Sequence, residues 1–167
     1  MEILKLATEW AKSEVYSTRF FIFFAILFIC SSIGFWQLGK TDLAKAYIIP
    51  SLVSGILLMT IGLGLFYTNK SRIIEFDKAF RVDAPSFYQS EIERSESTLK
   101  EYKVVFKVIP ILIIVAALLI LCIPTPTWRA ISITTIAMLS IILLIDGMAH
   151  ARIDSYYKEL KLLHSKN

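Results

Sequence analysis

The chain has 167 residues, of which 56% are hydrophobic and 19% are charged, and its formal net charge is +4 at pH 7. Soluble globular domains are usually about 45–50% apolar, and here the apolar residues gather in long blocks, which is typical of a multipass membrane protein. The basic residues form no stripe interleaved with aromatic side chains, so we expect no nucleic-acid binding.

Four apolar runs are long enough to cross a bilayer, which needs about 20 residues of helix. These runs are residues 20–38, 46–67, 104–123 and 128–145. Short connections, Gly39–Asp42 and Pro124–Thr127, separate the first pair and the last pair, whereas the middle connection is long and charged. We therefore predict one all-α domain with four transmembrane helices in up-down-up-down order, built from hairpins 1–82 and 83–167.

The basic residues predict how the chain is oriented in the membrane. Most of them precede the first span, lie in the middle connection or follow the last span, and the hairpin tips carry only Lys40, Lys45 and Arg129. By the positive-inside rule, both termini and the middle connection are cytoplasmic, and we expect the chain in the inner (plasma) membrane. Trp36 and Trp128 then lie at the outer interface, where amphipathic rings are favoured.

The charged segments continue the helical periodicity of the spans. In the middle connection, apolar residues recur at alternating spacings of four and three and run directly into the third span, and similar rows flank the other spans. We predict four helices of roughly 35–40 residues whose charged parts form a coiled-coil-like cytoplasmic bundle. The predicted seam of this bundle includes Ile92, Leu99, Tyr102, Ile153, Tyr156 and Leu160.

Residues 1–17 are amphipathic and contain a tryptophan, so a helix lying flat on the membrane surface is an alternative to one that joins the bundle. The stretch Val82–Ser86 interrupts the periodicity, and Ser86 with Gln89 resembles a capping box that would start the next helix.

Small residues on the second span predict a helix-packing face. Ser51, Gly55 and Gly62 lie on about one side of a helix, and small side chains let membrane helices approach closely. A bend or gate in this helix is the alternative. On the following helix, Glu91 and Arg94 belong to a cluster of charged residues that we interpret as a solvated face.

A polar cluster follows the last span. Asp146, His150 and Asp154 are four residues apart and share one helical face, an arrangement that can hold a metal ion or relay a proton. Asp146 lies about 26 Å of helix from Arg129, close to the full hydrocarbon thickness, so the cluster is expected at the inner membrane edge. We interpret these residues as structural groups bonded to each other or to neighbouring helices, with a metal site and a proton relay as alternatives.

The sequence contains none of the common catalytic motifs. It has no Gly-rich phosphate loop, paired-His motif, nucleophile elbow or cysteine pair, so we expect neither enzymatic activity nor a cofactor. Both halves run as cytoplasmic helix, span, tip, span and cytoplasmic helix, which is consistent with two parallel hairpin repeats.

The expected function is therefore that of a non-enzymatic, membrane-anchored interaction or regulatory module. It would engage a protein partner or a second copy through the cytoplasmic bundle, as in toxin immunity or as a subunit of an envelope complex. Two alternatives stay open. One is a small oligomeric channel or transporter, and the other is an intramembrane enzyme that uses Asp146 and His150.

Overall fold

The computed structural model describes residues 2–164, and every element in this range is helical. The helices are α1 (Glu2–Leu38), α2 (Asp42–Ala46), α3 (Ile48–Val82), α4 (Ala84–Cys122) and α5 (Pro126–His164). The four long helices have 37, 35, 39 and 39 residues, as their apolar periodicity predicted. Residues 1 and 165–167 of the two predicted hairpins lie outside the described residues.

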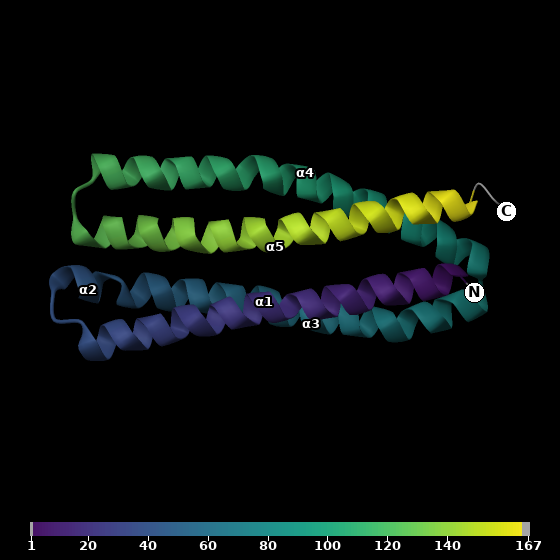
Figure 1. Cartoon of the computed structure of the whole chain (residues 1–167), viewed down its shortest axis with the longest axis horizontal. Helices are drawn as coiled ribbons and strands as arrows, with labels where there is room; N and C mark the ends of the chain where they lie inside the picture. The colour runs from purple at the N-terminus through teal and green to yellow at the C-terminus, as the bar shows by residue number, and fades with distance from the viewer. Residues whose placement is uncertain (1, 165–167) are drawn as a thin grey trace.

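The long helices lie along the long axis of the molecule and alternate in direction (Figure 1). α1 packs mainly against α3 and α4 mainly against α5, so two hairpins stand next to each other. The two ends of the chain and the α3–α4 turn lie at one end of the bundle, and the two other connections lie at the opposite end. Each long helix contains an apolar stretch long enough to cross a membrane, as in a multipass membrane protein.

The bundle has two halves of different chemistry. We call residues 20–67 and 104–145, near the α1–α2 and α4–α5 connections, the apolar half. The rest of the described chain, which contains the α3–α4 turn, is the charged half. α1 runs unbroken through both halves, and its residues Ala7, Trp10 and Ala11 are buried in the bundle. A separate helix on the membrane surface is therefore wrong for this segment.

One short helix was not predicted, and the predicted cap of α4 was wrong. The helix α2 follows the first connection, and the side chain of Thr41 caps its first turn by accepting a hydrogen bond from the amide of Ala44 at 3.2 Å. The cap of α4 is Asp83 rather than Ser86, and its carboxylate accepts from the Ser86 amide at 3.2 Å. Gln89 instead donates to Glu93 further along α4. Pro85 lies in the first turn, where its missing N–H costs nothing.

Each half has its own core. In the charged half all four long helices contribute, and the core contains Ala7, Trp10, Ala11, Phe76, Phe87, Tyr88, Ile153, Tyr156 and Leu160. The apolar half has a smaller core of Phe21, Ala25, Leu58 and Ile145, to which α4 contributes nothing. The outer face of α4 in this half exposes large apolar side chains such as Ile111 and Leu121.

Candidate functional site

The predicted packing face of α3 is buried. Ser51 is 3% exposed, and Gly55 and Gly62 are also buried in α3. A methyl group at Gly55 would come within 2.7 Å of Cγ1 of Ile29, and one at Gly62 within 2.9 Å of Cβ of Phe21. Because both neighbours belong to α1, glycine at these two positions permits the close approach of α1 and α3.

The core of the charged half contains a buried ion pair that the sequence did not predict. Glu91 is 3% exposed, and its two carboxylate oxygens accept from Nε and Nη2 of Arg94 at 2.9 and 2.6 Å. The hydroxyl of Tyr156 on α5 donates to the same carboxylate at 2.6 Å. The Arg94 guanidinium lies 4.2 Å from the centre of the Trp10 ring on α1, and this ring stacks on Tyr156 at 5.3 Å. We call these four residues the Glu91 network.

The Glu91 network corrects the prediction of a solvated face on α4. That prediction describes Glu96 and Lys100, an ion pair whose side chains are 47% and 69% exposed, but it is wrong for Glu91 and Arg94. Burial, and then the neighbouring Glu91 carboxylate, raise the pKa of Tyr156 well above its usual range. Tyr156 therefore stays protonated and keeps donating to Glu91.

A second ion pair connects α1 to α5 beside this network. Nε of Arg152 donates to Glu14 at 2.8 Å, and both side chains are largely shielded from solvent. The other end of the Arg152 guanidinium, Nη2, is buried and has no hydrogen-bond partner among residues 2–164. The indole nitrogen of Trp10 is also buried and has no hydrogen-bond partner in the same range. The α1–α5 contact therefore contains two buried donor groups whose hydrogen bonds are not made within the described residues.

A groove runs along this contact between α1 and α5. Two adjoining hollows of about 440 and 350 Å³ share Leu6, Glu9 and Glu159, and they extend from Ala151 to Leu163 on α5. We call them together the α1/α5 groove. Its floor contains the buried rings of Trp10 and Tyr156, members of the Glu91 network.

The rim of the α1/α5 groove is acidic. Glu2, Glu9 and Glu159 are exposed along it, and Lys5, which is paired with Glu9 at 3.9 Å, is its one exposed cation. Leu162 also lines the groove and is 61% exposed. An apolar floor with a negative rim suits an amphipathic, basic ligand.

The predicted polar cluster on α5 does not form one site. His150 makes edge-to-face contacts with Tyr102 and Phe106 of α4, with ring centres 5.7 and 5.3 Å apart. Asp154 pairs with Lys158 at 2.6 Å. Asp146 has no hydrogen bond to His150. Within residues 2–164, no three His, Cys, Asp or Glu side chains are grouped so that they could hold a metal ion.

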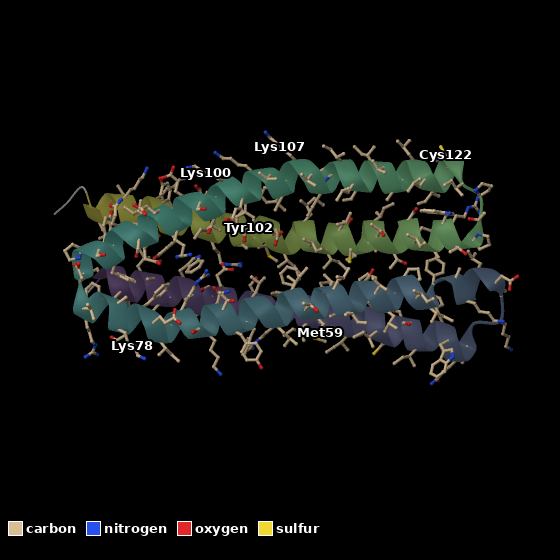
Figure 2. All side chains as sticks on the ribbon, turned by 180° about the vertical axis from the view of Figure 1, so that it is seen from behind. Met59, Lys78, Lys100, Tyr102, Lys107 and Cys122 are labelled. Atoms are coloured by element: carbon tan, nitrogen blue, oxygen red, sulfur yellow. The ribbon has the colours of Figure 1, made fainter. Side chains whose placement is uncertain are left out.

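The predicted seam residues lie in the core of the charged half. Ile153, Tyr156 and Leu160 of α5 are 3% exposed or less. Ile92, Leu99 and Tyr102 of α4 are partly buried and pack against the same core. Figure 2 shows Tyr102 on the side of α4 that faces α5, whereas Lys100 and Lys107 project away from the bundle.

No protein-family model matches the sequence, and no curated protein or solved structure shows significant similarity to it. Two features of the charged half stand out in the structure: the buried Glu91 network in its core and the α1/α5 groove beside it.

Proposed function

We propose that this protein is a non-enzymatic, multipass membrane protein whose charged half projects into the cytoplasm and docks a partner protein. Four helices with membrane-spanning apolar stretches support the insertion, and the concentration of basic residues at one end of the bundle supports the orientation. On this proposal, the apolar half is the anchor and the charged half is the working part.

The α1/α5 groove is the observation that carries the proposal. It runs from Ala151 to Leu163, thirteen residues of α5, or about 18 Å at the helical rise, which accommodates about three turns of a second helix. Helices that bind in grooves place an apolar face on the floor and polar residues at the rim. Three rim carboxylates against one lysine select a helix with basic residues beside its apolar face. The proposed occupant is therefore a basic amphipathic helix of the partner.

The Glu91 network supports this role because it holds the floor of the groove in place. Trp10 and Tyr156 form part of the floor, and both are fixed from below by Arg94 and Glu91. A floor that is already rigid loses little conformational entropy when a partner binds.

Site-specific photo-crosslinking in cells tests the proposal. A photoreactive amino acid at Ser155, which lines the groove, should crosslink to another protein, and the same amino acid at Lys100, on the outer face of α4, should not. The crosslinked peptide should be a basic amphipathic segment. The double change Glu9→Lys and Glu159→Lys should reduce the yield severalfold, whereas Glu96→Lys should leave it unchanged.

Three outcomes would contradict the proposal. One is the absence of a crosslink at Ser155 in cells that produce the protein at its natural level. Another is a crosslinked segment without basic residues. The third is a product with twice the mass of this chain, which would show that the groove pairs two copies.

A further inference from the structure

A third hollow lies in the apolar half, between the two hairpins. It has a volume of about 500 Å³ and is bounded by α2 and α3 on one side and by α5 on the other. Its walls are mainly apolar, with Val53 and Leu57 from α3 and Met138 from α5. Among residues 2–164, the core cluster between the hairpins in this half is the small one around Leu58 and Ile145. We call the hollow the inter-hairpin groove.

The polar groups of the inter-hairpin groove are unevenly distributed. Lys45 and the hydroxyl of Thr127 lie at the end near the helix connections, and both residues are exposed. Further along, Ser54 is only 5% exposed and lines the groove. A serine hydroxyl in a groove wall can donate a hydrogen bond to an acceptor oxygen of a bound molecule.

This gradient matches an amphiphile with an anionic head group. A cation at the mouth binds a phosphate, and the apolar walls beyond it bind a hydrocarbon chain. The groove faces the side of the bundle where Ile49 and Val53 are 71% and 49% exposed, and bilayer lipid would be in contact with those side chains.

We propose that the inter-hairpin groove binds one anionic phospholipid of the bilayer, with its phosphate on Lys45 and one acyl chain along Val53, Leu57 and Met138. The ester oxygens of the lipid lie between these two regions and supply acceptors for the hydroxyl of Ser54. The lipid fills the space that the two hairpins leave open and couples them in the apolar half. This site is separate from the α1/α5 groove, and it shares with the proposed function only the insertion of the apolar half into the membrane.

Lipid counting by native mass spectrometry tests the proposal. The full-length protein is reconstituted in vesicles of equal parts phosphatidylglycerol and phosphatidylcholine, extracted in mild detergent and partly delipidated. The wild-type protein should retain one phosphatidylglycerol in preference to phosphatidylcholine. Lys45→Gln should lower this preference about fivefold, which is the effect of one lysine near an anionic surface, whereas Lys40→Gln at the same end of the bundle should not change it.

A second pair of variants tests the position of the acyl chain. Val53→Trp fills the groove and should abolish retention, whereas Ile111→Trp on the exposed outer face of α4 should not. Equal retention by Val53→Trp and the wild type would overturn the proposal. An unchanged preference in Lys45→Gln would also overturn it. Because the two lysines are exposed, their comparison decides the question even if Val53→Trp does not fold.

Discussion

Replacing Glu91 with alanine should destabilise the protein strongly, because it breaks the Glu91 network at its centre. The carboxylate accepts three hydrogen bonds, two from Arg94 and one from Tyr156, and it is 3% exposed. Its removal leaves a guanidinium that is 20% exposed without its counter-ion and a buried hydroxyl without its acceptor. Removing one partner of a buried ion pair costs about 3–5 kcal/mol, and we expect Glu91→Ala to fall in this range.

Thermal unfolding of the purified protein in a mild detergent, followed by circular dichroism, measures the effect. The matched control is Glu96→Ala, five residues further along the same helix. Glu96 pairs with Lys100, but both side chains are largely exposed, and such surface pairs contribute about 0–1 kcal/mol. The two variants remove the same chemical group from the same helix, so the difference between them isolates burial.

A double-mutant cycle then assigns the energy to particular contacts. Tyr156→Phe removes only the hydroxyl that donates to Glu91, and a hydrogen bond to a charged group contributes about 1.5–3 kcal/mol. Combined with Glu91→Gln, the change at Tyr156 should cost clearly less than it does alone. If Glu91→Ala and Glu96→Ala lowered the unfolding temperature equally, or if the cycle showed no coupling, the Glu91 network would not stabilise the charged half.

Three further predictions test other parts of the molecule. Gly55→Ala should lower the free energy of unfolding by about 1–3 kcal/mol, because the added methyl group meets α1. The control is Gly64→Ala, which should not destabilise the protein because nothing lies within 4 Å of its added methyl group. Equal stabilities of the two variants in thermal unfolding would contradict the close α1–α3 contact. Asp146→Asn should change stability by about 1 kcal/mol or less, and metal that is bound to the wild type but not to this variant would contradict a structural role. In a cysteine-free background, an impermeant thiol reagent outside the cell should label Thr125→Cys and not Ser90→Cys, and the reverse pattern would overturn the proposed orientation.

The long helices could be predicted because their signal is local and repeated. Apolar residues at alternating spacings of three and four continue from each span into its charged extension, and the structure has one unbroken helix over each such stretch. The buried positions Ile153, Tyr156 and Leu160 follow from the same periodicity. The start of α4 also follows approximately, because Pro85 suits a first helical turn.

The Glu91 network could not be predicted in the same way. Glu91 is three residues after Tyr88 and four before Ser95, so Glu91 and Ile92 fit the spacing of the buried face of α4 equally well. A carboxylate is normally exposed unless it is paired, and its second partner, Tyr156, is 65 residues away on another helix. The decisive contact is therefore tertiary, and no local pattern in the sequence contains it.

The predicted hairpin repeat stays a prediction, and the packing of the two hairpins shows where they differ. α1 and α3 approach closely because Gly55 and Gly62 lie in their contact. The one glycine of the second hairpin, Gly147, has nothing within 4 Å, so α4 and α5 pack without such a contact. If the halves share an origin, only the helix order and the length of the helices have been kept.

The two halves of the bundle use different physics to hold the same four helices together. In the charged half, which water would surround on the proposed insertion, the hydrophobic effect favours an aromatic core, and paired charges such as Glu91 and Arg94 can be buried because each has a partner. In the apolar half, on the proposed insertion, lipid is as apolar as the side chains, so association depends on close contact at glycine and on polar bonds such as Ser32 to Ile48. α4 contributes no residue to the core cluster of this half, and it packs mainly against α5. The charged half is therefore the part that fixes all four helices relative to one another, and a partner that binds across α1 and α5 there would act on the whole bundle.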